Sequence, residues 1–252
     1  MTEALATPAT SHRTVLITNA LAYTGPGAVP ALLARGMRVA CHDPAFADSA
    51  ARERAQSHWP EALLLHETDP VAAAAEATAS FGDLEAVVSN DVYPLSPRPI
   101  ESLDLDDLRR TFEAVTVTPI RLAQVVLPTM KQRRRGAMVF VTSARERKPE
   151  LGYAVPTTAR AATTAFAKAL AREAAPYQVQ VTVVAPNYLE SELYYPRARF
   201  VDDPVGRAEI AGLVPFGRLG TPVEVGALIA FLASGTAPFV TGQVIDFTGG
   251  WP

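Results

Sequence analysis

The chain of 252 residues is poor in cysteine and lysine, has no strong excess of either charge and contains no long hydrophobic run. Its one cysteine, Cys41, excludes an intrachain disulfide framework and a zinc site built from cysteines. No apolar run approaches the ~18 residues needed to cross a bilayer, so we expect no membrane span. The net charge of −3 leaves no basic domain, which argues against nucleic acid as the main partner.

The first twelve residues do not resemble a signal peptide, because they lack its charged start and its long apolar stretch. We interpret residues 1–12 as a disordered tail and expect residues 13–252 to form a single domain of a soluble, cytoplasmic protein. Hydrophobic residues make up 48% of the chain and charged residues 19%. This composition allows a large core and excludes global disorder.

From Thr14 onward, short β-branched runs alternate with longer segments rich in alanine and leucine. The short runs are almost wholly apolar, which is typical of strands that are covered on both faces. The expected strands are 15–18, 38–41, 86–89, 137–142, 179–184 and 243–247. The expected helices are 26–35, 48–57, 70–81, 104–134, 157–174 and 222–234. This alternation predicts an α/β fold with one doubly wound parallel sheet of the Rossmann type.

The loop after the first expected strand is the usual place for a dinucleotide cofactor. Such a site needs glycines, which let the backbone approach a pyrophosphate at the N-terminus of a helix. Asn19 and Tyr23 stand at the positions of the first two glycines, and only Gly25 remains. Because the phenol of Tyr23 fills space that the cofactor needs, we interpret the loop as one wall of a small-molecule pocket. A degenerate loop that still binds NAD is the alternative.

A serine and an arginine follow at a notable spacing. Ser143 comes directly after the expected strand 137–142, and Arg160 lies seventeen residues later on the first turn of the expected helix 157–174. Taken singly, such a serine usually caps a turn and such an arginine is usually solvated or ion-paired. The spacing makes the pair more informative than either residue alone. We expect the nearby Arg145 to be exposed to solvent, and a position facing the site is the alternative.

The sequence resembles the halohydrin dehalogenases, which are cofactor-independent relatives of the short-chain dehydrogenases. The likeness extends over residues 13–252 and is most specific in Pro186-Asn187-Tyr188-Leu189. Together with this segment, the aromatic first loop and Arg160, where the dehydrogenases have lysine, point to the dehalogenases. The other matching segments are Cys41-His42-Asp43, Ser89-Asn90-Asp91, Thr142-Ser143-Ala144 and Tyr195-Pro196.

This resemblance implies that a vicinal haloalcohol closes to an epoxide with loss of halide, and that small anions reopen the epoxide. It implies no cofactor, no metal and a homotetramer. Ser143 is expected to bind the substrate oxygen, Arg160 to lower the pKa of a catalytic tyrosine, and Asp91 to link Arg160 to solvent as a proton relay. The residues expected around the halide and the substrate are Tyr23, Pro186, Asn187, Tyr188, Leu189 and Tyr195.

The catalytic tyrosine of that family is missing from its place. Thirteen residues after Ser143 stands Pro156, which can neither donate nor accept a proton, and the nearest phenol is Tyr153. Proline suits the first turn of the helix that carries Arg160. In one interpretation that helix starts earlier, and Tyr153 enters the vacated space as the base. In another, Tyr153 is a surface residue and the protein has altered or no dehalogenase chemistry. An NAD(P)-dependent oxidoreductase is the third and least favoured hypothesis.

Overall fold

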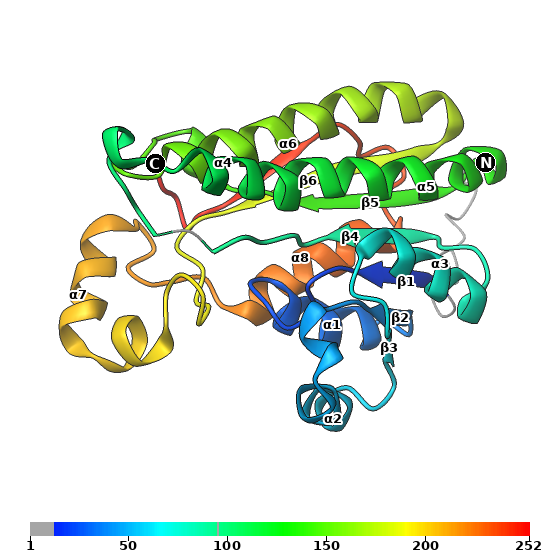
Figure 1. The fold of residues 1–252 in the computed structure, drawn as a ribbon, viewed down its shortest axis with the longest axis horizontal. Helices are drawn as coiled ribbons and strands as arrows, with labels where there is room; N and C mark the ends of the chain where they lie inside the picture. Colours follow the sequence, from blue (N-terminus) through cyan, green and yellow to red (C-terminus); the bar gives the residue numbers. More distant parts are fainter. Residues whose placement is uncertain (1–12, 95) are drawn as a thin grey trace, which may run out of the picture.

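The computed structural model describes residues 13–94 and 96–252. Its strands form one parallel sheet of seven strands in the order β3-β2-β1-β4-β5-β6-β7. The strands are β1 (Thr14–Ile17), β2 (Arg38–Cys41), β3 (Leu63–Leu64), β4 (Ala86–Ser89), β5 (Gly136–Val141), β6 (Val179–Pro186) and β7 (Val244–Phe247). The prediction of a doubly wound parallel sheet is confirmed (Figure 1). The predicted tail, residues 1–12, lies outside the described residues.

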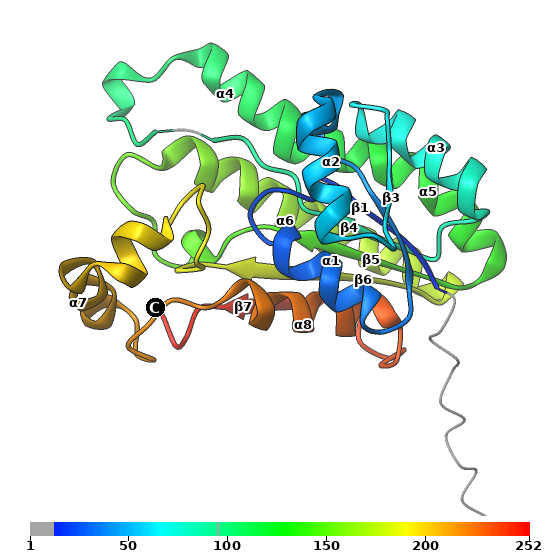
Figure 2. The same ribbon diagram turned by 90° about the horizontal axis from the view of Figure 1, so that it is seen from below.

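Helices cover both faces of the sheet (Figures 1 and 2). They are α1 (Gly25–Leu33), α2 (Ser49–His58), α3 (Pro70–Phe81), α4 (Leu105–Phe112), α5 (Thr118–Arg133), α6 (Ala154–Ala174), α7 (Pro204–Leu213) and α8 (Pro222–Ser234). Helices α3, α5 and α6 pack on one face, and α1, α2 and α8 pack on the other. Helix α7 lies apart at one end of the molecule. Among the helices of the described residues, none is long and apolar enough to cross a membrane.

Burial on both faces explains the apolar sequences of the strands. In β1, Leu16 enters the core on the side of α3 and α5, whereas Val15 and Ile17 enter the core on the side of α1 and α8. No position of such a strand faces water, so none favours a polar side chain. All six expected strands occur, with ends that differ by no more than two residues. The two-residue β3 and helix α7 were not expected.

The expected long helix 104–134 is interrupted. Helices α4 and α5 are joined by one turn of π-helix, Glu113–Val117. Asp104 caps the N-terminus of α4, because its side chain accepts a hydrogen bond from the backbone N–H of Asp106 at 2.8 Å. Thr221 likewise caps α8, in a reciprocal arrangement with Glu224. Both caps satisfy backbone N–H groups that lack partners within the helix.

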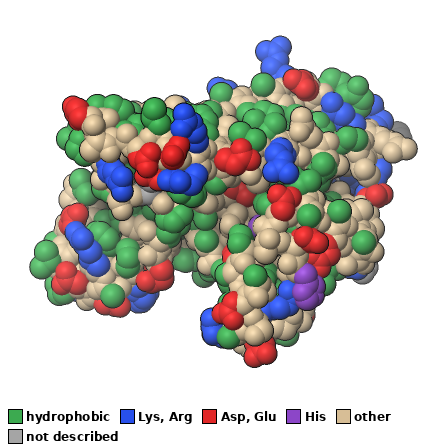
Figure 3. Space-filling view, viewed as in Figure 1, with side chains coloured by type: hydrophobic (Ala, Val, Ile, Leu, Met, Phe, Trp, Pro, Cys, Tyr) green, Lys and Arg blue, Asp and Glu red, His purple; other side chains and the backbone are tan. Residues whose placement is uncertain are grey.

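Acidic and basic side chains lie next to one another on the face shown in Figure 3. Several of them form ion pairs, such as Arg110 with Asp107 at 2.8 Å and Arg121 with Asp69 at 3.5 Å. Exposed pairs of this kind contribute about 0–1 kcal/mol each. They keep opposite charges interspersed on this face.

Helices α1 and α8 cross at two glycines, and this crossing positions the loop that precedes α1. A Cβ added to Gly226 would lie 2.1 Å from the carbonyl oxygen of Gly27. A Cβ added to Gly27 would lie 1.7 Å from the carbonyl oxygen of Pro222. The two backbones are therefore in direct contact, and a larger residue would force them apart.

We expect Gly226→Ala to lower the free energy of unfolding by about 1–3 kcal/mol, because the added methyl group would displace α1. Gly212→Ala is the matched control, since nothing lies within 4 Å of a Cβ at that helical position. It should leave stability unchanged or raise it by up to about 1 kcal/mol. Urea unfolding of the two variants is the measurement, and equal stabilities would contradict the expectation.

Candidate active site

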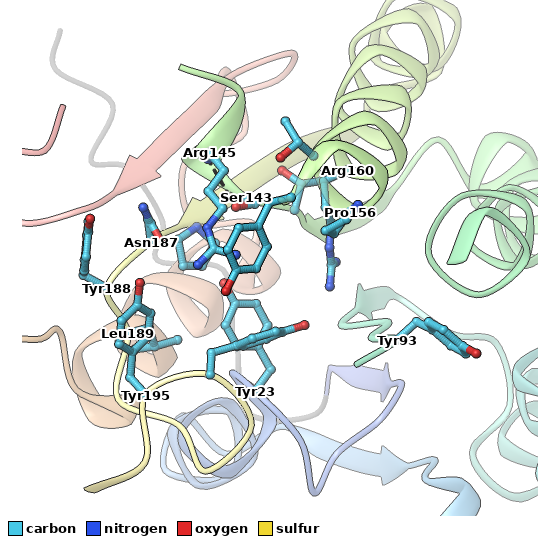
Figure 4. Close-up of a pocket in the computed structure, with 15 residues that line it drawn as sticks. Tyr23, Tyr93, Ser143, Arg145, Pro156, Arg160, Asn187, Tyr188, Leu189 and Tyr195 are labelled. Atoms are coloured by element: carbon cyan, nitrogen blue, oxygen red, sulfur yellow. Dashed lines mark hydrogen bonds between the residues drawn. The ribbon is translucent and has the colours of Figure 1, made fainter. Parts of the chain in front are cut away.

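One pocket opens at the carboxyl ends of the strands, where ligands of doubly wound sheets bind (Figure 4). Its volume is about 580 Å³, including the part that is open to solvent. Six of the seven tyrosines in the sequence line it. The lining residues are Tyr23, Tyr93, Thr142, Ser143, Arg145, Tyr153, Pro156, Thr157, Arg160, Pro186, Asn187, Tyr188, Leu189, Tyr194 and Tyr195.

The loop between β1 and α1 keeps a backbone suited to glycine but carries side chains. Asn19 and Tyr23 have φ angles of 48° and 53°, in the left-handed region that glycine adopts most easily. Gly25 remains glycine because a Cβ there would lie 2.2 Å from the carbonyl oxygen of Ala20. The ring of Tyr23 is buried, and its centroid lies 5.2 Å from that of Tyr194 in an edge-on contact. The loop therefore contributes a wall to the pocket.

These residues do not fit a nicotinamide dinucleotide. The buried ring of Tyr23 stands where the backbone of a glycine loop would approach the pyrophosphate. An acidic residue after the second strand usually binds the ribose. Here Asp43 accepts hydrogen bonds from the backbone N–H groups of Leu21 at 2.8 Å and Ala45 at 2.9 Å. Its two oxygens are thus engaged in holding the protein's own loops.

The structure brings Ser143 and Arg160 to the same pocket. Ser143 follows β5, and its Oγ accepts a hydrogen bond from the backbone N–H of Arg145 at 3.2 Å. Arg160 lies on α6 and is 7% exposed. Its Nη1 donates to the carbonyl oxygen of Val141 at 2.8 Å, which anchors the guanidinium beside the end of β5.

Tyr153 also lines the pocket, because α6 begins earlier than expected. The helix starts at Ala154, so Tyr153 is its N-cap residue and Pro156 lies within the first turn. Tyr153 is half-buried. Among the hydrogen bonds of the described residues, none joins the Tyr153 hydroxyl to Ser143 or Arg160. The three side chains therefore share one pocket without a direct hydrogen bond from the Tyr153 hydroxyl to the other two.

The expectation that Arg145 is exposed was wrong. Its side chain is only 14% exposed and lines the pocket. The guanidinium carbon lies 4.1 Å from the centroid of the Tyr153 ring, in a cation–π contact. Its Nε lies 3.4 Å from a carboxylate oxygen of Glu150. The ring and the carboxylate hold this arginine against the pocket, with Ser143 drawn between it and Arg160 in Figure 4.

Asp91 is buried and does not line the pocket. Its carboxylate accepts hydrogen bonds from the Ser89 hydroxyl and, at 3.1 Å, from Nδ2 of Asn19. Among the ion pairs of the described residues, none joins it to Arg160. Burial raises the pKa of the Asp91 carboxyl, and the hydrogen bonds and the charge of Arg160 offset that rise only in part.

The segment after β6 forms the opposite wall. Tyr188 has a φ of 53°, and its ring centroid lies 5.5 Å from that of Tyr195 and 5.4 Å from that of Trp251. Burial raises the pKa of the Tyr195 hydroxyl to about 12, and it also raises the pKa of Tyr188 and Tyr23. These three phenols therefore stay protonated near neutral pH and serve as hydrogen-bond donors or apolar walls. Figure 4 shows Tyr195 and Leu189 facing the arginine side of the pocket.

Six lining residues are not among the predicted site residues: Tyr93, Thr142, Arg145, Pro156, Thr157 and Tyr194. The sequence contained an indication for Tyr194, because it directly precedes Tyr195, which was predicted to line the pocket. Tyr93 lies apart from the others at one side of the pocket (Figure 4). Its place depends on the course of the loop after β4, which no short-range pattern predicts.

A comparison with protein-family models identifies the family of this chain. A family model described as enoyl-(acyl carrier protein) reductase matches residues 25–252. The chain belongs to the short-chain dehydrogenase/reductase family.

Two solved structures show which members of this family the chain resembles in structure. One, described as a dehalogenation enzyme, has a TM-score of 0.92 and 36% identity, and the match covers 97% of this chain and 100% of that one. A halohydrin dehalogenase bound to ethyl (2S)-oxiran-2-ylacetate has a TM-score of 0.91 and 34% identity, covering 95% and 97%. The predicted resemblance to halohydrin dehalogenases is confirmed.

Curated relatives carry the names of oxidoreductases. The 3-oxoacyl-[acyl-carrier-protein] reductase of Salmonella typhimurium is 31% identical over 75% of this chain and 76% of its own length. The cis-4-hydroxycyclohexanecarboxylate dehydrogenase of Sinomonas cyclohexanicum is 30% identical over 96% and 97%. The family is thus shown, and the chemistry has to be argued from the pocket.

The buried carboxyl of Asp91 should make stability depend on pH. Because its pKa is raised in the folded protein, its contribution is fully present below the unfolded pKa of about 3.9 and is lost as the pH rises through the folded pKa. We expect Asp91→Asn to gain stability relative to the original chain as the pH rises from 4 to 8. Urea unfolding across this range is the measurement, and a constant difference would contradict the raised pKa.

Proposed function

We propose that this pocket closes small haloalcohols to epoxides with release of halide, and opens epoxides with small anions, without a nicotinamide cofactor. The observation that supports this most is that Ser143, Tyr153 and Arg160 line one pocket. The chain around them is 34–36% identical, over at least 95% of its length, to two solved structures described as a dehalogenation enzyme and a halohydrin dehalogenase.

Ser143 is suited to hold the substrate oxygen. Its Oγ already accepts a hydrogen bond from the backbone N–H of Arg145, so the hydroxyl hydrogen is free for the substrate. In the proposed reaction the substrate hydroxyl gives its proton to the ionised phenol of Tyr153. The alkoxide oxygen forms a bond to the neighbouring carbon as the carbon–halogen bond breaks. The halide leaves with the bonding pair, so the products are an epoxide, a halide ion and a protonated phenol.

Tyr153 is the phenol that best suits the base. Pro156, at the family position, has no group that takes up a proton. Burial keeps the phenols of Tyr23, Tyr188 and Tyr195 protonated, as their raised pKa values indicate. A positive charge favours the ionised form of a nearby phenol, and the guanidinium of Arg160 lines the same pocket.

The wall after β6 suits a leaving halide. A halide develops charge as its bond breaks, and it is favoured by weak donors among polarisable apolar groups. We assign this place to Tyr23, Pro186, Asn187, Tyr188, Leu189 and Tyr195. Asp91 is proposed as a proton relay towards solvent. Arg160 stays protonated throughout, and its charge acts on the buried carboxyl of Asp91.

A nicotinamide-dependent oxidoreductase is the second candidate, because the curated relatives have the names of reductases and dehydrogenases. The buried ring of Tyr23 and the engaged carboxylate of Asp43 argue against nicotinamide binding, and so does arginine in place of lysine at position 160. A member of the family with altered or no dehalogenase chemistry is the third, since Pro156 replaces the catalytic tyrosine.

Halide release from 1-bromo-2-propanol should separate these candidates. We expect Tyr153→Phe and Ser143→Ala each to lower kcat/KM by about 10²–10⁴, as is typical when proton transfer or its positioning is lost. Tyr177→Phe is the control, because that phenol lies outside the pocket and contacts Lys131. Unimpaired release by Tyr153→Phe would remove it from the mechanism, and no release by the original chain would favour altered chemistry.

Nicotinamide binding is a separate measurement. We expect no quenching of tryptophan fluorescence by micromolar NADH or NADPH, because the ring of Tyr23 fills the cofactor's place. Tyr23→Gly, which restores a glycine at a left-handed position, tests whether that ring is the obstacle. Micromolar affinity of the original chain would instead favour the oxidoreductase.

A further inference from the structure

The pocket carries positive charge without a matching carboxylate in its lining. Arg145 and Arg160 both line it, whereas no aspartate or glutamate does. Their side chains are 14% and 7% exposed, so both guanidinium groups are largely removed from water. A buried charge is costly unless a group of opposite charge accompanies it.

Neither guanidinium is fully engaged by the protein. Nη1 of Arg160 donates a hydrogen bond to the carbonyl oxygen of Val141, which is neutral. Nε of Arg145 donates to a carboxylate oxygen of Glu150 at 3.4 Å. The Tyr195 phenol, which is neutral, also hydrogen-bonds the Arg145 guanidinium. A carboxylate on a ligand suits this guanidinium better than a neutral phenol, because a planar acceptor binds it through two parallel hydrogen bonds.

The surroundings of Arg145 hold its guanidinium group in place. The ring of Tyr153 lies against its flat face at 4.1 Å, and Glu150 holds the Nε edge. The Oγ of Thr157, one turn into α6, is buried without a hydrogen-bond partner in the described residues and also lines the pocket. The pocket thus offers an acceptor-rich ligand a fixed cation and a hydroxyl donor.

We propose that Arg145 is a specificity residue that binds a carboxylate on the substrate, so that the preferred substrates are small haloalcohols or epoxides bearing a carboxylate group. This assignment rests on the proposed function. Arg160 then acts on the phenol and the substrate oxygen, while Arg145 neutralises the substituent at the other end of the molecule. A neutral substrate makes no such ionic contact with Arg145.

The first test measures binding without turnover. Butanoate and butanamide have the same shape and differ in charge, and calorimetric titration gives the affinity of each. We expect butanoate to bind at least about tenfold more tightly, because a hydrogen bond to a carboxylate is stronger than one to a neutral amide. Arg145→Gln should abolish this preference and Arg145→Lys should retain part of it.

Arg147→Gln is the matched control for the loss of a positive charge. Its side chain lies two residues further on, is 44% exposed and pairs with Asp246. The preference for butanoate should survive in this variant. Equal binding of butanoate and butanamide by the original chain, or an unchanged preference in Arg145→Gln, would overturn the proposal. So would chloride that binds in an Arg145-dependent way while butanoate does not.

The second test measures turnover. The ester epoxide held by one structural relative has a ring-opened counterpart, ethyl 4-chloro-3-hydroxybutanoate, whose free acid adds the carboxylate. We expect the ratio of kcat/KM for the acid to that for the ester to fall about tenfold or more in Arg145→Gln, as loss of a charge-assisted bond implies. A ratio that does not change would contradict the assignment, because a merely structural role lowers both rates together. If neither compound releases chloride, the proposed function fails, and the butanoate titration still decides whether Arg145 binds carboxylates.

Discussion

The pocket depends on the side chain of Asn90, which ties the end of β4 to the loop after β1. Its Nδ2 donates to the carbonyl oxygens of Asn19 and Ala22, both at 2.9 Å, and its Oδ1 accepts a hydrogen bond from the Thr24 hydroxyl at 2.6 Å. Asn90 is fully buried, so these bonds do not compete with water. They hold the loop in its left-handed course, and that course aims the ring of Tyr23 into the pocket.

The left-handed backbone of this loop is compatible with glycines and with larger side chains. Where glycines occupy the left-handed positions of this loop, the backbone is open to a pyrophosphate. Where Asn19 and Tyr23 occupy them, one side chain binds Asp91 and the other packs on Tyr194. This explains how a chain can be about 30% identical to named reductases and also match a halohydrin dehalogenase in structure.

Local patterns were sufficient for most of the fold and for part of the site. The strands 38–41 and 86–89 could be bounded from sequence because buried parallel strands are short and apolar, whereas β3 has only two residues. Ser143 could be placed because it directly follows a strand. The burial of Arg145 could not, because it depends on Tyr153 and Glu150 in a loop whose course no periodicity describes.

The proline at position 156 and the position of Arg145 are connected through the start of helix α6. Proline has no N–H, and the first turn of a helix needs none, so Pro156 is accommodated once α6 begins at Ala154. That start leaves Tyr153 just outside the helix, on a loop, with its ring beneath the guanidinium of Arg145. Under the proposed function, the base then approaches the substrate from the loop side and brings a second cation with it. Substrate charge, more than substrate size, is the property that such a pair of guanidinium groups distinguishes.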